Sequence, residues 1–277
     1  MNILICNERF IFRYGVDRVL TILGKGLKDL GHNVCIMGNR FDRDVVKSLA
    51  SQIIDVPSAG NYINGYEFTL DWLEHNWDKY FKDRPDIILV AGWPFFSSIP
   101  FFRKIGSKVI FIDFGAVPID GYSGDLLVVQ EKLRRLRKHY LIYTSFIIGI
   151  SNFVADTQSK SDSLHKVPVQ SILLGADHME MSIWQAKHLK LEKSRGYAID
   201  LLNSLKRQGR KIIFCLGRWE PNCYKNSDAA FEIMSQINNV YHCALLILSD
   251  PSNTELPSDL KDVIFPIGFP DDDELEN

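Results

Sequence analysis

Short apolar runs recur along the first part of the chain, and they are continuous rather than alternating. Such runs are typical of strands that are buried on both faces of a parallel sheet. Stretches with helical periodicity lie between most of them. The strand candidates are residues 2–6, 34–37, 53–56, 86–91, 108–112, 146–150 and 169–174, and the helix candidates are 16–31, 65–81 and 125–143. This alternation predicts a doubly wound α/β domain over residues 1–180, with ligands at the carboxyl ends of its strands.

The pattern then breaks and begins again. Residues 186–209 are polar and rich in lysine, and we expect residues 181–209 to form a helical connector. The strand KIIFCL, the helix SDAAFEIMSQI and the strands CALLILS and VIFPIGF follow, so the opening of a second α/β domain is predicted over residues 210–277. A half-domain would leave an unpaired sheet edge. We therefore expect the second domain to be incomplete and the chain to be truncated.

Composition narrows the class of protein without naming a function. The 277 residues are 46% hydrophobic and 24% charged, and the net charge is −2, so no global charge favours a nucleic-acid partner. No stretch reaches the ~20 apolar residues of a membrane span, and Glu8 and Arg9 end the first apolar run too early for a signal peptide. The five cysteines show no CxxC spacing. These features favour a cytoplasmic globular protein with reduced thiols.

The segment GRWEPNCYKNSDAAFEI carries the clearest candidate chemistry. Gly217 and Arg218 end a strand, and Lys225 stands just before a helix. The first N–H groups of a helix and its dipole favour an anion, and arginine adds a fork of donors that matches a phosphate. We interpret the pair as a phosphate site. The alternative is two solvated surface cations.

A second candidate lies at the start of the first predicted helix. In RYGVDRV, Gly15 stands where the chain enters that helix, and a glycine there lets the backbone approach a ligand. No GxGxxG and no P-loop spacing accompanies it. The alternative is an ordinary turn glycine.

Five segments, in collinear order, resemble conserved segments of one enzyme family. They are RYGVDRVLTILGKGLKDLGHNV, PDIILVAGW, GISNFVADTQ with SILLGAD, GRWEPNCYKNSDAAFEI, and IGFPDDDELEN. Together they resemble the retaining family 4 glycosyltransferases, which have the GT-B fold of two Rossmann-like domains. The resemblance implies a sugar transferred with retention from a nucleotide-sugar donor to a glycan, lipid-linked or protein acceptor.

The resemblance also implies roles for individual residues. Arg218 and Lys225, with Gly217, would bind the donor diphosphate and stabilise the leaving group. Gly15 and Tyr14 would face the donor from the other domain. No metal and no other cofactor is implied, and we interpret the acids at Asp271–Glu274 as a helix cap rather than a metal site.

The sequence departs from the family in three places. Tyr14 replaces the first of two paired glycines. In VIFIDFGAVP, Asp113 stands within about one position of the usual histidine, and it either accepts hydrogen bonds from sugar hydroxyls as a catalytic-site residue or caps a turn. The acidic motif that contacts the sugar and the ribose would lie beyond residue 277. We therefore expect this chain to be weakly active.

Two further interpretations stay open. The basic helix over residues 131–143 is either a solvated face or a peripheral contact with an anionic membrane. The function could also be that of a sugar-nucleotide epimerase or of a non-catalytic module with the same fold.

Overall fold

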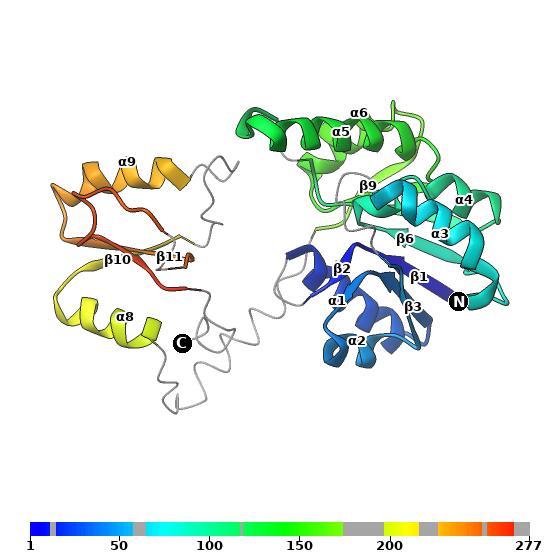
Figure 1. Cartoon of the computed structure of the whole chain (residues 1–277), viewed down its shortest axis with the longest axis horizontal. Helices are drawn as coiled ribbons and strands as arrows, with labels where there is room; N and C mark the ends of the chain where they lie inside the picture. Colours follow the sequence, from blue (N-terminus) through cyan, green and yellow to red (C-terminus); the bar gives the residue numbers. More distant parts are fainter. Residues whose placement is uncertain are drawn as a thin grey trace. The chain divides into compact units, whose positions relative to one another are not determined.

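The chain forms two compact units. The computed structural model describes residues 1–11, 15–57, 65–116, 119–173, 197–215, 227–250 and 254–268. Unit 1 comprises Met1–Ala116 and Asp125–Leu174, and unit 2 comprises Val117–Gly124 and Gly175–Asn277. Both are drawn in Figure 1.

Unit 1 is built on a parallel sheet of seven strands, in the order β5-β3-β1-β6-β7-β8-β9. The strands are β1 (Asn2–Cys6), β3 (Asn33–Gly38), β5 (Gln52–Asp55), β6 (Ile87–Val90), β7 (Lys108–Asp113), β8 (Phe146–Gly149) and β9 (Val169–Ser171). Every pairing in this sheet is parallel. The predicted parallel α/β domain is confirmed.

Helices cover both faces of this sheet, as Figure 1 shows. They are α1 (Gly15–Asp29), α2 (Arg43–Leu49), α3 (Gly65–Tyr80), η1 (Trp93–Phe95), α4 (Ile99–Lys104), α5 (Gly124–Leu141), the π-helix η3 (Val154–Ser159) and α6 (Lys160–Asp162). Leu4 and Cys6 point into the core under α3 and α4, whereas Ile3 and Ile5 point into the core under α1 and α2. Because both faces are buried, the strands read as continuous apolar runs.

The order of strands changes direction next to β1. From β1 the chain proceeds outward through β3 to β5, and then returns to β6 on the other side of β1 before continuing to β9. Cys6, the last residue of β1, is therefore paired with Val90, the last residue of β6. This switch point is where doubly wound sheets bind ligands, at the carboxyl ends of the strands.

A pair of two-residue strands extends this edge. β2 (Arg9–Phe10) pairs in parallel with β4 (Arg40–Phe41), just past the ends of β1 and β3. The rings of Phe10 and Phe41 are stacked, with centroids 5.7 Å apart. The segments that leave β1 and β3 are thereby held side by side.

Unit 2 contains a smaller parallel sheet, in the order β10-β11-β12. Its elements are α8 (Tyr197–Arg207), β10 (Lys211–Cys215), α9 (Ser227–Asn238), β11 (Cys243–Ile247) and β12 (Ile264–Pro266), and the single-turn η2 (Ile119–Gly121) is also assigned to it. The sequence placed residues 197–207 in a connector. In the structure Leu205 of α8 packs with Ala244 and Leu246 of β11, so this helix is part of the core of unit 2.

Candidate functional site

The carboxyl ends of β1 and β6 approach each other very closely. The N–H of Ala91 donates to the carbonyl of Cys6 at 3.0 Å. A Cβ on Gly92 would lie 2.5 Å from the backbone nitrogen of Glu8 and 2.6 Å from Oδ1 of Asn7. Only a glycine fits there. This contact defines the switch-point edge of unit 1, and we take it as the candidate ligand site.

Asp17 fixes the loop that leaves this edge. Its carboxylate is 1% exposed and accepts hydrogen bonds from Asn7 Nδ2 at 3.0 Å, Arg9 Nε at 3.1 Å and the N–H of Ile11 at 3.2 Å. Burial raises the pKa of Asp17, although the Ile11 hydrogen bond and Arg9 oppose that rise. The loop from β1 to α1 is therefore tied to the first turn of α1.

Gly15 begins α1, as the sequence predicted. A Cβ on Gly15 would meet nothing within 4 Å among the described residues, so this glycine is not required by packing. Asp17 already places a negative charge in the first turn of the helix. The carboxylate therefore competes with any anion for the positive end of the helix dipole.

Glu8 is a further carboxylate at this edge, two residues past the end of β1. It is half-buried, and within the described part of the chain its carboxylate makes no hydrogen bond or ion pair. Burial raises the pKa of Glu8; Arg9 and Arg40 counteract this, and Asp17 adds to it. The sequence analysis used Glu8 only to exclude a signal peptide. In the sequence this carboxylate stands two residues after the buried strand β1.

Asp113 ends β7 and is completely buried. Its Oδ1 accepts hydrogen bonds from the N–H of Gly115 and from Arg137 Nη1, both at 2.8 Å. Its Oδ2 accepts from Arg137 Nη2 and from the Ser159 hydroxyl. The turn cap that the sequence offered as one interpretation is present in the Gly115 hydrogen bond, and the sugar-contact role of Asp113 stays a prediction. A sugar could reach this carboxylate only by displacing protein donors.

Arg137 holds Asp113 from the opposite side. It is 6% exposed, and its Nε donates to Asp162 Oδ2 at 2.5 Å. Burial acts to lower the pKa of Arg137, but the hydrogen bonds and charges of Asp113 and Asp162 outweigh it and raise the pKa. The guanidinium therefore stays charged in the interior of unit 1.

Because Arg137 is buried, the basic face predicted over residues 131–143 exposes fewer cations than the sequence suggested. Arg137 is unavailable to a membrane, and Lys132 Nζ lies 5.2 Å from the centre of the Tyr66 ring. Arg134, Arg135 and Lys138 remain exposed. The surface is thus smaller than the sequence suggested, and peripheral membrane contact stays a prediction. None of the described helices is long and apolar enough to span a bilayer.

The π-helix clamps the turn that follows β7. The N–H of Ala116 donates to Gln158 Oε1 at 2.6 Å, and Ser159 reaches Asp113. Gly115, at a φ of +91°, supplies the left-handed conformation that the turn needs. π-Helical turns occur frequently at functional sites. Here the π-helix sets the shape of the carboxyl edge at β7.

Several predicted site residues lie outside the described part of the chain. These are Tyr14, Gly217, Arg218 and Lys225, and the acids of Asp271–Glu274 lie there too. Their predicted roles stay predictions. Among the described residues, no group of three His, Cys, Asp or Glu side chains is arranged to hold a metal ion.

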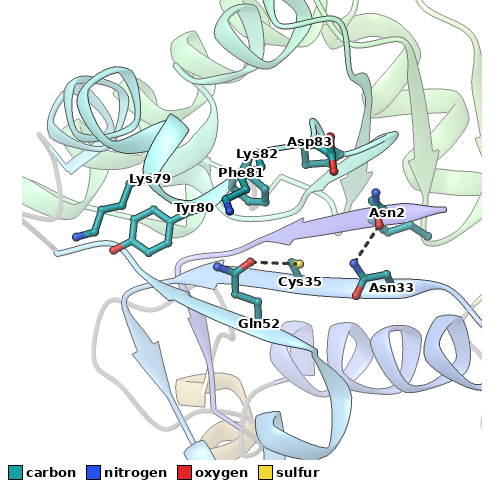
Figure 2. Close-up of a pocket in the computed structure, with 11 residues that line it drawn as sticks. Asn2, Asn33, Cys35, Gln52, Lys79, Tyr80, Phe81, Lys82 and Asp83 are labelled. Carbon is teal, nitrogen blue, oxygen red and sulfur yellow. Dashed lines mark hydrogen bonds between the residues drawn. The ribbon is translucent and has the colours of Figure 1, made fainter.

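A separate cavity of about 350 Å³ lies at the opposite edge of the sheet, at the amino ends of β1, β3 and β5. Figure 2 shows Cys35 and Gln52 on one side of it and Lys79, Tyr80 and Lys82 on the other. The Cys35 thiol points to Gln52 Oε1, 3.8 Å away. Ligands of doubly wound sheets bind at the carboxyl edge. The cavity is therefore not assigned to the main site.

Comparison with known proteins bears on the fold. No family model and no curated protein matches the sequence. The chain is similar to the solved structure of a glycosyltransferase from Rickettsia africae ESF-5, at 17% identity and a TM-score of 0.61, over 99% of this chain and 70% of that one. It is also similar to the catalytic domain of Starch Synthase IV from Arabidopsis thaliana bound to ADP and acarbose, at 15% identity and a TM-score of 0.64, over 99% of this chain and 75% of that one.

The chain has a GT-B fold. A third similar structure is UDP-GlcNAc 2-epimerase from Neisseria meningitidis bound to UDP-GlcNAc, at 14% identity and a TM-score of 0.55, over 100% of this chain and 74% of that one. The predicted fold class is confirmed. One fold here carries both transfer and epimerisation, so the reaction must be argued from residues rather than from the fold. Membership of family 4 stays a prediction.

Proposed function

We propose that this protein is a glycosyltransferase that moves a sugar, with retention, from a nucleotide-diphosphate donor to a glycan, lipid-linked or protein acceptor. One observation carries the proposal: the likeness to glycosyltransferases covers 99% of the chain, and so includes both parallel sheets. A single Rossmann-like unit would suit many nucleotide-binding proteins. Two successive units of this kind suit a donor nucleotide sugar and its acceptor.

The chemistry of donor binding rests on the two cations that the sequence singled out. In the proposal Arg218 and Lys225 bind the diphosphate, and they stabilise the charge that develops on the leaving phosphate when the glycosidic bond to the donor breaks. Preorganised donors of this kind contribute about 3 kcal/mol each to transition-state stabilisation. No metal ion is needed in this scheme. Gly217, Gly15 and Tyr14 remain proposed backbone and loop contacts of the donor.

Calorimetric titration with UDP-, GDP- and ADP-glucose tests the donor assignment. We expect one nucleotide to bind best, and Arg218→Ala and Lys225→Ala each to weaken all three donors by about 10- to 100-fold, since a phosphate contact carries no base identity. Lys206→Ala and Arg207→Ala are matched controls, because both cations are exposed on α8. Failure of every donor to bind would remove the proposed function.

The epimerase alternative is favoured by one observation, the likeness to UDP-GlcNAc 2-epimerase. Incubation with UDP-GlcNAc alone separates the two reactions. An epimerase yields an isomerised sugar nucleotide without any acceptor, whereas a transferase, with only water present to accept the sugar, yields UDP and free sugar. Donor binding with neither product, even after a glycan acceptor is added, would favour the third possibility, a non-catalytic module.

A further inference from the structure

The small sheet of unit 2 has two edges, and one of them offers no backbone donor. At β12 the carbonyl of Val263 and the N–H of Ile267 are hydrogen-bonded to β11. The bonding side alternates along a strand, so Ile264 and Pro266 face away from β11. The N–H of Ile264 donates to the carbonyl of Leu260 at 2.9 Å, and a proline has no N–H. The outer edge of β12 is therefore closed to a further strand.

The outer edge of β10 has no such protection. The N–H of Lys211 donates to the carbonyl of His242, just before β11, at 2.9 Å. The alternate residues Ile212 and Phe214 therefore direct their N–H and C=O groups away from β11, and neither N–H has a partner among the described residues. An edge with free backbone groups, and with no proline or charge in its middle, readily pairs with another strand.

The side chains of β10 are those of an interior strand. Ile212 is half-buried, and Phe214 is 44% exposed. In unit 1 the strands β1, β3 and β5 follow one another as β10, β11 and β12 do, and there β1 is paired on both sides. Ile5, the fourth residue of β1 as Phe214 is of β10, is 0% exposed. β10 thus has the composition of a central strand but is paired on one side only within the described chain.

We propose that this edge of β10 pairs with the same edge of a second copy of the chain, antiparallel, about a two-fold axis between the two Ile213 residues. In this register Ile212 of each copy lies opposite Phe214 of the other. Both residues carry free N–H and C=O groups, so each pair exchanges two hydrogen bonds. Isoleucine and phenylalanine are a favourable cross-strand pair. Lys211 lies opposite Cys215, so no like charges meet.

Two properties of the edge favour a second copy as its occupant. The contact is self-complementary, since one strand supplies both members of every pair. A two-fold contact is also closed, so association stops at the dimer. The joined sheet covers Phe214 and leaves the two β12 edges outermost, and those edges lack donors. This interface does not depend on the proposed function.

Sedimentation velocity of the whole protein between about 1 and 100 μM tests the interface, and we expect a reversible dimer. Phe214→Lys places a charge in the contact, and Ile212→Pro removes an N–H that β11 does not use. Each should raise the Kd of the dimer about 10-fold or more. Leu30→Lys is the matched control, because Leu30 is 74% exposed but lies in unit 1, and this variant should dimerise as the wild type does.

A disulfide tests the register independently. The two Ile213 residues form a pair without hydrogen bonds, whose Cα atoms lie about 4.5 Å apart, within reach of a disulfide. Under mild oxidation we expect Ile213→Cys to give more covalent dimer than the wild type with its own cysteines. Ile212→Cys has no copy of itself opposite, so it should give no more than the wild type.

The results distinguish the possible occupants of this edge. A dimer that both edge variants weaken and that Ile213→Cys traps supports pairing between copies. A wild type that stays monomeric at about 100 μM overturns it, and favours a parallel strand of another polypeptide, as β6 pairs with β1. Open-ended oligomers, or a dimer that neither edge variant weakens, overturn it as well. If circular dichroism shows that one edge variant does not fold, the other variant and the disulfide decide.

Discussion

Arg137 is a cation enclosed between two buried carboxylates. Asp113 is 0% exposed and Asp162 5% exposed, and the guanidinium donates to both. Such a network is not in itself more stabilising than an apolar core of the same volume. Removal of one member is costly, however, because the remaining charges stay buried without a counter-ion. The single arginine therefore fixes the end of β7, α5 and the short helix α6 together.

We predict that Arg137→Leu lowers the free energy of unfolding by about 3–5 kcal/mol at neutral pH. The reason is that the carboxylates of Asp113 and Asp162 lose their cation but cannot reach water. The loss should shrink at low pH, because a protonated carboxyl costs less to bury than a carboxylate. Urea denaturation of unit 1, followed by tryptophan fluorescence, measures both effects.

Arg134→Leu is the matched control, since Arg134 lies on the same helix and is exposed. Its effect should stay within about 0.5 kcal/mol, as for most surface substitutions. Equal stability of the two variants would show that the buried network is dispensable.

The raised pKa of Glu8 gives a second residue-level prediction. The folded protein holds the proton of Glu8 more tightly than the unfolded chain does, so the Glu8 contribution to stability falls as the pH rises from about 4, the unfolded value, through the raised pKa. A glutamine side chain does not titrate, so it makes no pH-dependent contribution to stability. Glu8→Gln should therefore gain stability relative to the wild type as the pH rises, in urea titrations between about pH 4 and pH 8. A difference that is constant with pH would contradict this.

At the scale of residues, the sequence pointed to Asp113 as a candidate site residue but did not predict which residues contact it. Asp113 was recognised as important, but its partners Arg137 and Ser159 lie 24 and 46 positions away, and pairing of that kind depends on the fold. Arg137 was grouped with its neighbours as a surface cation because helical periodicity does not distinguish one charged residue from the next. The sequence did not indicate that Glu8 lies at the switch-point edge, because that position depends on the strand order.

At the scale of elements, the continuous apolar runs were reliable. The run at residues 2–6 is β1, and the one at 146–150 corresponds to β8 (Phe146–Gly149), because burial on both faces selects the same residue types at every position. The elements not predicted were short. The β2–β4 pair, α4 and the π-helix each cover too few residues for a period to appear. α8 was placed in a connector because charged residues surround its apolar stripe.

Gly92 and Gly26 distinguish the effect of close packing on stability from the effect of backbone freedom in the unfolded chain. Gly92 has a φ of −99°, which any residue can adopt, so only its contacts with Glu8 and Asn7 exclude a side chain. We predict that Gly92→Ala lowers the free energy of unfolding by about 1–3 kcal/mol, because the ends of β1 and β6 must move apart. Chemical denaturation measures this loss.

Gly26→Ala is the control for this prediction. Gly26 lies within α1, where an added Cβ would meet nothing within 4 Å among the described residues. Alanine there should raise the free energy of unfolding by about 0.5–1 kcal/mol, since the unfolded chain loses freedom. If both alanine variants were stabilised, the close approach at Gly92 would not constrain the site.

At the scale of the whole molecule, the fold could be predicted but the reaction could not. Five weak motifs in collinear order pointed to the GT-B fold, and structures at 17% identity or less share it. The GT-B arrangement depends on where strands and helices occur along the chain, and many different sequences can produce the same succession of elements. Transfer and epimerisation differ through a few side chains. Both reactions would require binding of the donor diphosphate, and Arg218 and Lys225, the residues that the sequence offered, belong to that shared step.

Metal removal provides the last test, because two cations and a metal ion are alternative ways to hold a diphosphate. If Arg218 and Lys225 carry the charge, then UDP, GDP or ADP at about 100 times its Kd should stabilise the protein by about 2.7 kcal/mol, with or without EDTA. The Arg218→Ala/Lys225→Ala double variant should lose this stabilisation, while Lys206→Ala/Arg207→Ala keeps it. Thermal unfolding measures all four cases. Stabilisation that disappears with EDTA and returns with Mg²⁺ would instead assign the diphosphate to a metal ion, and would remove the leaving-group role of the two cations.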